Sequence, residues 1–339
     1  MERKIYKNRH LKTVSLFAGV GGLDLGFLNA GFDIVWANDI DKYATEVYKH
    51  NISDHIVLGD INELLDDIPQ HDVLIGGFPC QPFSMMGQQL GFEDERGTLF
   101  FTIEQIVRQH RPKIIVLENV KNLETHNNGK TFARMKEILE DELTDGNGFG
   151  YEVFHKVLNT SDFGIPQTRR RVFIVAFDKG YFTNNINFEF PEIKDLSIKL
   201  KDILDEKVDK KYFLSEKILP TILSNGTGNY YSKSEIDLEI ARPLCATMHK
   251  MHRASQDNYV TDKENRKIFD DTEERRISNV RRLTPNECRK LQGFPSDWNI
   301  NVSDTQAYRQ FGNAVTVDVA YYLAMKIVDA LDITLEPEE

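Results

Sequence analysis

The chain has few cysteines, and they form no pattern that would hold a metal or a disulfide framework. Cys80, Cys245 and Cys288 are its three cysteines among 339 residues, and no two of them form a CxxC pair. The nine histidines form no HExxH pattern. Disulfide scaffolds and cysteine-based zinc sites are therefore excluded, the cysteine usage fits a reducing compartment, and we expect no metal cofactor.

Long apolar runs and an excess of positive charge are also missing. No run approaches the roughly 20 apolar residues of a membrane span, and the basic amino terminus lacks the apolar stretch of a signal peptide. We therefore expect a soluble, cytoplasmic protein that contacts no membrane. The formal net charge is -11, so binding to nucleic acid would need local clusters of Lys and Arg, such as Lys250 to Arg253.

Short β-branched runs alternate with amphipathic segments from Thr13 to Phe177, a pattern typical of a mostly parallel sheet wound by helices. A chain of this length accommodates one large domain and a smaller companion. Seven strands are predicted, at residues 14–17, 34–37, 55–58, 73–76, 114–117, 151–157 and 172–177. The last two strands are too close for a crossover helix and should pair antiparallel.

The regular alternation stops after Phe177, and residues 184–279 are richer in polar and turn-forming residues. We interpret this stretch as a smaller, irregular domain. Helical signals return at Thr284, where Pro285 and Glu287 complete a capping box.

A final apolar helix is predicted from about residue 315 to residue 331. We expect this helix to fold back onto the first domain. The predicted first domain then comprises residues 1–183 and 312–339, and residues 280–311 form a hinge and return segment.

A glycine turn, FAGVGG at residues 17–22, follows the first predicted strand and precedes a helix. Glycines at this point let the backbone approach a ligand at the carboxyl end of the sheet. Asp24 stands where the dinucleotide fingerprint GxGxxG needs its last glycine, which disfavours an oxidoreductase that binds NAD. The alternative interpretation of the turn is a simple tight connection.

Two carboxylates follow the next two strands. Asp39 ends the second strand, where a ribose would offer two hydroxyls, and Asp60 follows the third strand beside the expected purine. Either one could instead be a helix N-cap. Together with the glycine turn they describe an adenosine pocket without a phosphate cradle, which suits S-adenosylmethionine better than NAD.

The fourth strand leads into GFPCQPFS, residues 77–84, which resembles the Pro-Cys motif of the cytosine-C5 DNA methyltransferases. Further blocks match that family in the same order: FAGVGG, GFEDERGTLFF, ENV at 118–120, QTRRR at 167–171, RRLTPNECRKLQGFP and QFGNAV at 310–315. The resemblance covers essentially everything except residues 184–279.

This resemblance implies an α/β, Rossmann-like methyltransferase fold that binds S-adenosylmethionine, with a smaller target-recognition domain. It also implies DNA (cytosine-5-)-methyltransferase activity on duplex DNA, in a bacterial restriction-modification system. A cognate restriction endonuclease is then a functional partner rather than a physical one, and we expect a monomer.

Cys80 fits the chemistry of such an enzyme. Adding a thiolate to C6 of cytosine converts the ring to an enamine that can attack an electrophilic methyl group, and only the thiolate attacks. A lone cysteine is usually an inert core residue. Cys80 lies between two prolines and leads into a polar loop, so it fits that alternative poorly, whereas Cys245 and Cys288 fit it better.

The resemblance assigns Glu118 to the N3 and N4 edge of the cytosine and Arg171 to its O2 and ring. Arg169 would support the loop or bind a phosphate. Residues 169 and 171 should point the same way along a strand, with Arg170 facing oppositely. The alternatives are that Glu118 is a surface acid and that the arginines are surface charges without a catalytic role. Residues 85–101 resemble the mobile catalytic loop of the family, which closes on the flipped base.

The late motif around Asn313 resembles a segment that returns to the methyl-donor pocket, although Asn313 could also be the N-cap of the final helix. The residues assigned to this pocket are Phe17, Val20, Gly21, Gly22, Asp39, Ile40, Asp60, Ile61, Pro79, Leu99, Asn313, Ala314 and Val315.

A cytosine inside a duplex must leave the base stack before its ring can react. The segment from Arg242 to Tyr259 mixes cations, amides and hydroxyls suited to major-groove edges, so we predict that it belongs to the target-recognition region. The alternative is a solvated loop. The predicted DNA contacts are Ser84, Gln88, Arg96, Arg242, Thr247, Lys250, His252 and Arg253. Methylation of RNA and a catalytically inactive DNA-binding paralogue are the competing functions.

Overall fold

The computed structural model describes residues 11–79, 99–182, 186–192, 197–227, 230–269 and 276–335. The chain divides into two compact units that interleave along the sequence. Unit 1 comprises Met1–Leu158, Arg170–Glu192 and Val319–Glu339, and unit 2 comprises Asn159–Arg169 and Ile193–Asp318. Unit 2 therefore also takes in the expected hinge segment.

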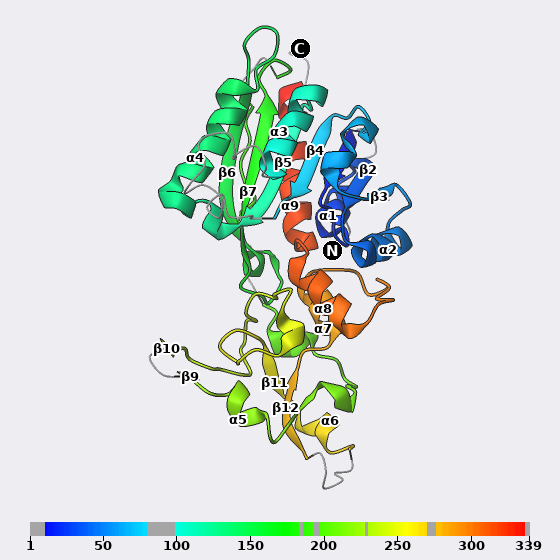
Figure 1. The fold of residues 1–339 in the computed structure, drawn as a ribbon, viewed down its shortest axis with the longest axis vertical. Helices are drawn as coiled ribbons and strands as arrows, with labels where there is room; N and C mark the ends of the chain where they lie inside the picture. Colours follow the sequence, from blue (N-terminus) through cyan, green and yellow to red (C-terminus); the bar gives the residue numbers. More distant parts are fainter. Residues whose placement is uncertain are drawn as a thin grey trace. The chain divides into compact units, whose positions relative to one another are not determined.

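Unit 1 contains a seven-stranded sheet in the order β3-β2-β1-β4-β5-β7-β6 (Figure 1). The first five of these strands run parallel to one another, and β7 pairs antiparallel with β5. The strands are β1 (Lys12–Leu16), β2 (Asp33–Asp39), β3 (Ile56–Leu58), β4 (Val73–Gly77), β5 (Ile114–Val120), β6 (Tyr151–Asn159) and β7 (Arg170–Asp178). All seven predicted strands are confirmed, with ends that differ by a few residues.

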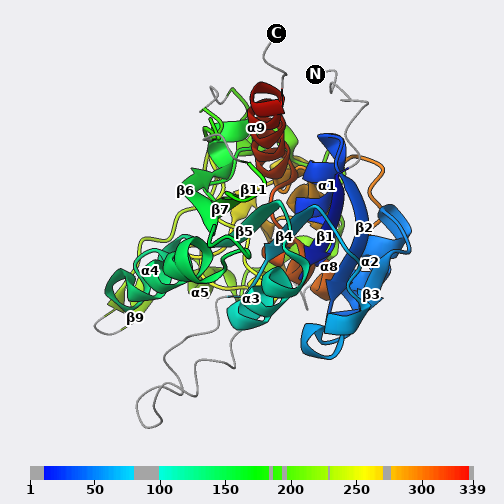
Figure 2. The same cartoon turned by 90° about the horizontal axis from the view of Figure 1, so that it is seen from above.

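Helices cover both faces of this sheet. Figure 2 shows α3 (Leu99–His110) and α4 (Lys130–Glu137) on one face, and α1 (Gly22–Asn29) with α9 (Val317–Leu335) on the other. Helix α2 (Lys42–Asn51) also belongs to this unit, and Asp41 caps it by accepting hydrogen bonds from two backbone amides. Because α9 packs on α1, the prediction that the final helix folds back onto the first domain is confirmed.

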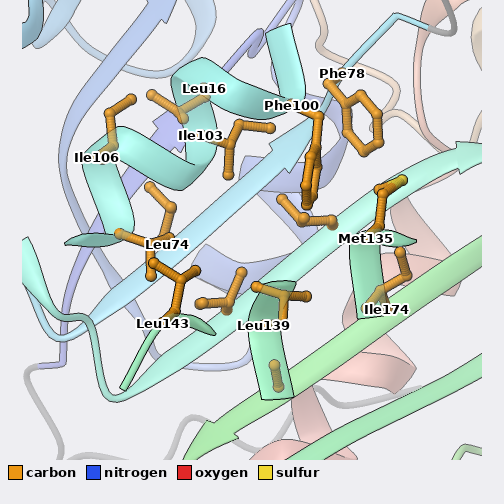
Figure 3. Close-up of a cluster of buried hydrophobic side chains, with 14 of the residues drawn as sticks. Leu16, Leu74, Phe78, Phe100, Ile103, Ile106, Met135, Leu139, Leu143 and Ile174 are labelled. Carbon is orange, nitrogen blue, oxygen red and sulfur yellow. The ribbon is translucent and has the colours of Figure 1, made fainter. Parts of the chain in front are cut away.

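One apolar cluster in the core of unit 1 lies between the sheet and the helices α3 and α4. Phe100, Ile103 and Ile106 recur at helical spacing on α3, and all three are buried. They pack against strand residues that include Leu16 and Leu74 (Figure 3). This apolar layer fixes the strands from one side.

The strand order reverses between β1 and β4, because β2 and β3 extend the sheet on one side of β1 and β5 extends it beyond β4. In an open parallel sheet, ligands bind outside the carboxyl ends of the strands at such a switch point. The ends of β1, β2, β4 and β5 therefore define the edge on which a site is expected.

Unit 2 combines a three-stranded antiparallel sheet in the order β11-β12-β8 with short helices and a small hairpin. Its elements are β8 (Phe213–Ser215), α5 (Leu219–Ile222), β9 (Gly226–Thr227), β10 (Tyr230–Tyr231), β11 (Tyr259–Thr261), α6 (Lys263–Arg266), β12 (Ile277–Arg282), α7 (Pro285–Leu291) and α8 (Asp304–Asn313). The predicted capping box at Thr284 and Glu287 is confirmed at the start of α7. In the described part of the chain, no helix is long and apolar enough to cross a membrane.

We predict that Gly26→Ala destabilises unit 1. A Cβ at Gly26 would lie 2.4 Å from the Cβ of Ala320 and 2.7 Å from the backbone nitrogen of Tyr321, so α1 and α9 would have to separate. Overpacking of this kind costs about 2 kcal/mol, more than the roughly 1 kcal/mol that alanine contributes to a helix. Urea unfolding measures the difference. The control is Gly146→Ala, where a Cβ meets nothing within 4 Å in the described part of the chain; equal stabilities of the two variants would contradict the close packing.

Two buried histidines give the stability a pH dependence. The rings of His71, just before β4, and His110, at the end of α3, have centroids 5.1 Å apart. His71 donates a hydrogen bond from Nδ1 to the Pro69 carbonyl at 2.8 Å, and burial lowers its pKa from 6.5 to about 4. The unfolded chain therefore binds more protons at His71 between these two values.

The stabilising contribution should be complete above about pH 6.5 and should fall as the pH decreases toward 4. Unfolding in urea at about pH 7 and about pH 5 should show a loss of about 2 kcal/mol that His71→Gln removes. His155→Gln, at an exposed position, should keep the wild-type dependence. A His71→Gln variant with that same dependence would contradict this assignment.

Candidate active site

The turn between β1 and α1 leaves open space beside its first glycine. Gly19 has a φ of +57°, and a Cβ built on it meets no atom of the described residues within 4 Å. Gly21 has a φ of +84°, and a Cβ there would lie 2.3 Å from Ile52 Cδ1, so glycine is required for this turn to pack on the end of α2. Val20 is buried, and Phe17 is half-buried with a φ of 56°. The turn thus exposes backbone at the switch point.

Asp24, which breaks the dinucleotide fingerprint, is buried and makes hydrogen bonds within the fold. Its carboxylate accepts hydrogen bonds from the Ser15 and Tyr48 hydroxyls, each at 2.7 Å. Burial raises the pKa of this carboxyl to about 6. Asp24 therefore joins α1 to β1 and α2.

Asp39 holds the glycine turn against the end of β2. Its two carboxylate oxygens accept hydrogen bonds from the backbone nitrogens of Gly19 and Asp41, both at 2.7 Å. Burial raises the pKa of the Asp39 carboxyl. Beside it, Ile40 is 71% exposed and Leu58 is 47% exposed. A carboxylate next to exposed apolar side chains suits a ligand with hydroxyls and a flat apolar ring.

The N-cap alternative is confirmed for Asp60, whose Oδ1 accepts a hydrogen bond from the Asn62 backbone at 3.0 Å. Ile61 is 2% exposed and packs in the core of unit 1, and Leu99 packs partly buried against the same cluster. These two side chains therefore present little surface to a ligand. Pro79 is exposed at the last described position before residue 99.

An ion pair joins Glu118 of β5 to Arg171 of β7. Arg171 Nε lies 3.0 Å from Glu118 Oε1, with 21% and 10% of the two side chains exposed. The register explains the pair: Glu118 is opposite Phe173 and Val120 is opposite Arg171, so the two charged side chains are diagonal neighbours on one face of the sheet. A carboxylate and a guanidinium so placed can bind the polar edge of a flat ring.

Asn119 connects this strand end to the segment that carries Pro79. It is 2% exposed, its amide nitrogen donates to the Phe78 carbonyl at 2.9 Å, and its amide oxygen accepts from the Val120 backbone at 2.8 Å. Asn119 therefore fixes the backbone just before Cys80. Cys80 itself, Ser84, Gln88 and Arg96 lie outside the described residues, as does most of the expected catalytic loop.

Arg169 belongs to unit 2 and lies just before β7, which begins at Arg170. The alternation along one strand that was expected for residues 169 and 171 therefore does not extend to Arg169. Arg169 is 2% exposed, and its guanidinium donates to the carbonyls of Leu244 at 2.8 Å and Ala314 at 2.9 Å. These surroundings favour the supporting role over a phosphate contact. Arg170 is exposed.

The late motif ends helix α8 in unit 2. Asn313 is the last residue of α8 and is exposed, whereas Ala314 and Val315 are buried. The alternative that Asn313 caps the final helix is wrong, because α9 begins only at Val317. Its side chain is therefore not occupied by a capping role.

The recognition segment, residues 242–259, is an ordered loop within unit 2. Arg242 is tied to the side chain of Asn258, while Thr247 and Lys250 are exposed. The His252 backbone is held at both ends, since its nitrogen donates to Asp257 at 2.7 Å and its carbonyl accepts from the Tyr259 hydroxyl at 2.6 Å.

In the same segment Arg253 is half-buried. The cysteine expectation needs a correction there, because Cys245 is exposed rather than part of the core. Its segment packs on Gly312 through the backbone, which leaves the thiol outside. Cys288 is buried as expected, and burial raises its pKa.

Comparison with known proteins identifies the family. The model of the C-5 cytosine-specific DNA methylases matches residues 11–329. The chain belongs to this family. It is 39% identical to the type II methyltransferase M.HaeII of Haemophilus aegyptius over 96% of this chain and 95% of that protein. It is 38% identical to the type II methyltransferase M1.ScrFI of Lactococcus lactis subsp. cremoris over 96% and 80%. The chain is thus a DNA (cytosine-5-)-methyltransferase, as its motifs predicted.

Solved structures agree with the fold. The S. pombe Dnmt2 methyltransferase superposes with a TM-score of 0.72 at 21% identity, covering 95% of this chain and 100% of that one. A putative DNA modification methyltransferase encoded in an E. coli prophage gives 0.66 at 22% identity, covering 95% and 99%. These likenesses confirm the expected α/β architecture.

Asn119 is the residue of the enzyme that our sequence reasoning missed. It lies within the matched ENV block, so the signal was present, but only the fold shows that its amide reaches Phe78, the residue after β4. Asn119→Ala should leave the Phe78 carbonyl without this donor, cost about 2 kcal/mol of unfolding free energy, and slow methylation about tenfold because the segment before Cys80 loses its anchor.

Urea unfolding and a methylation time course measure these two effects. Asn122→Ala, at an exposed position three residues later, is the matched control and should behave as the wild type. Wild-type turnover by Asn119→Ala would remove this residue from the site.

Proposed function

We propose that this enzyme methylates C5 of a flipped cytosine within a specific duplex DNA site, with Cys80 as the nucleophile. The observation that carries the proposal is the Glu118–Arg171 ion pair at the carboxyl end of β5, next to the strand that leads into Cys80. Gly77 of β4 pairs with Glu118, so β4, which precedes Cys80 in the chain, ends beside the carboxylate.

Cys80 would form a bond from its thiolate sulfur to C6 of the cytosine, which makes C5 nucleophilic. After methylation of C5, loss of the C5 proton and departure of the thiolate restore the aromatic ring. Glu118 would hold a proton at N3, which draws electrons from C6 and assists the attack. Arg171 would orient Glu118 through their ion pair and donate to O2 of the ring.

The residues at the ends of β1 and β2 fit S-adenosylmethionine. The open space beside Gly19 admits a ligand against the backbone, Asp39 offers a carboxylate to ribose hydroxyls, and the exposed Ile40 and Leu58 offer apolar surface to a purine. When bound, S-adenosylmethionine supplies an electrophilic methyl group. We also assign the backbone of Gly21 and Gly22 to this pocket. By resemblance, the assignment includes Pro79, Asn313, Ala314 and Val315.

Unit 2 would supply the DNA contacts through the recognition segment, with the exposed Thr247 and Lys250 as its foremost candidates. The relatives named above are type II methyltransferases, which supports a role in restriction-modification beside a cognate endonuclease. We propose a monomer that acts inside a bacterial cell.

Cys80→Ala should abolish methylation, because no other group supplies the bond to C6. Incorporation of a labelled methyl group into DNA measures activity, and calorimetric titration with S-adenosylhomocysteine measures cofactor binding. The binding and the unfolding temperature should stay near those of the wild type. Normal turnover in this variant would exclude the covalent mechanism.

Glu118→Gln should lower the rate of the chemical step about a hundredfold or more, since the amide cannot hold the proton at N3. Single-turnover methylation at saturating DNA isolates that step. A rate near that of the wild type would remove Glu118 from its proposed role.

Bisulfite sequencing of host DNA after expression of the enzyme tests the substrate. Protected cytosines in one recurring sequence context are expected, and the context defines the recognition site. Incubation of the purified enzyme with duplex DNA and with tRNA separates the DNA function from its RNA alternative. Methylation of tRNA without methylation of duplex DNA would overturn the proposal.

A further inference from the structure

Arg169 is enclosed by backbone carbonyls from two separate segments of unit 2. Besides Leu244 and Ala314, its Nη2 atom donates to Gly312 O at 3.1 Å and lies 3.4 Å from Asn313 O. A planar guanidinium suits such a divergent set of acceptors, which an ammonium group cannot satisfy at once. At 2% exposure the side chain has little surface left for a substrate.

The neighbouring residues bind the same part of the chain. Gln167 is fully buried, accepts from the Leu244 backbone nitrogen at 2.8 Å and donates to the Leu291 carbonyl at 2.7 Å. Thr168 donates its backbone N–H to the Ala241 carbonyl at 2.8 Å. Residues 167–169 thus hold both polar backbone atoms of Leu244, with the adjoining Ala241 held beside them.

These hydrogen bonds hold the base of the recognition segment. Arg242 and Asn258 bond to each other through the backbone of the first and the side chain of the second, so the chain between them is a loop closed at its base. A Cβ at Gly312 would lie 2.3 Å from the Ala246 nitrogen, so the loop also rests directly on the end of α8.

The two sides of the Arg169 contact differ in what else holds them. The turn after α8 has a second support, because Gln292 donates to the carbonyls of Phe311 and Ala314. On the other side, the Leu244 carbonyl accepts from Arg169, whereas Gln167 holds the Leu244 nitrogen. Loss of Arg169 therefore releases mainly the recognition segment.

We infer that Arg169, together with Gln167, is a positioning residue for the DNA recognition segment and does not contact the cytosine. This inference rests on the proposed role of that segment in binding DNA. It separates the three consecutive arginines: Arg169 orders the recognition loop, Arg170 is exposed, and Arg171 serves the reacting base.

The test uses one substitution at three adjacent positions: Arg169→Lys, Arg170→Lys and Arg171→Lys. Each keeps the charge and removes the planar fork. A duplex that carries the site mapped by bisulfite sequencing gives kcat and KM for DNA, and titration without DNA gives the affinity for S-adenosylhomocysteine.

Arg169→Lys should raise the KM for DNA about tenfold, as expected when the charged hydrogen bond to the Leu244 carbonyl is lost, with kcat at saturating DNA within about twofold of the wild type. Its affinity for S-adenosylhomocysteine should not change. Arg171→Lys should lower kcat, and Arg170→Lys should match the wild type. A fall in kcat at unchanged KM in Arg169→Lys would show a substrate contact and overturn the inference.

Hydrogen exchange of the DNA-free protein gives an answer that does not depend on activity. Amides 244–248 should exchange faster in Arg169→Lys, while those of α7 stay protected. Gln167→Met, which removes the partner of the Leu244 nitrogen, should give the same pattern and serves if Arg169→Lys does not fold. Unchanged exchange at 244–248 overturns the inference. If the wild type methylates no duplex DNA, the proposed function is refuted, and hydrogen exchange alone decides whether Arg169 orders this segment.

Discussion

Glu118 ends the buried part of β5 with a tenth of its side chain exposed, and Arg171 of the antiparallel strand β7 supplies the opposite charge at 3.0 Å. Removing one partner of such a pair leaves the other charge largely buried without its counter-charge, which costs several kcal/mol of folding free energy. The pair depends on the β5–β7 register, because a slip of one residue would turn Arg171 to the other face. The direction of β7, opposite to that of β5, is thus what brings the guanidinium to the carboxylate.

The same sheet arranges the remaining parts of the site. Its strand order places the ends of β1 and β2 beside those of β4 and β5, so the glycine turn with Asp39 and the polar pair at Glu118 occupy one edge. Asn119, on the strand face opposite Glu118, reaches the backbone of Phe78 and so couples the fixed strand to the segment that carries the nucleophile. A rigid edge with short polar links allows a catalytic loop to be positioned without many contacts of its own.

The QTRRR block shows how far a sequence motif can be interpreted. Three consecutive arginines have the same side-chain chemistry, yet in the fold Arg169 donates to backbone carbonyls, Arg170 is exposed and Arg171 forms an ion pair. Burial decides among these roles, because a guanidinium removed from water must find acceptors wherever the surrounding backbone offers them. The expectation that Arg169 supports the loop or binds a phosphate came from its place in the motif, and its carbonyl partners in unit 2 favour a supporting role.

Hydrophobic periodicity, turn residues and ordered motifs were enough to predict all seven strands of the large sheet, the return of the final helix, the capping box at Thr284 and the family. Those features are local or depend on which face of an element is apolar, and both are written in the sequence. The partners of buried polar groups were not predictable: the amide of Asn119 with Phe78, the carboxylate of Asp24 with Tyr48, the guanidinium of Arg169 with Leu244, and the exposed thiol of Cys245. Each depends on which distant segment packs beside it, and only the tertiary structure decides that.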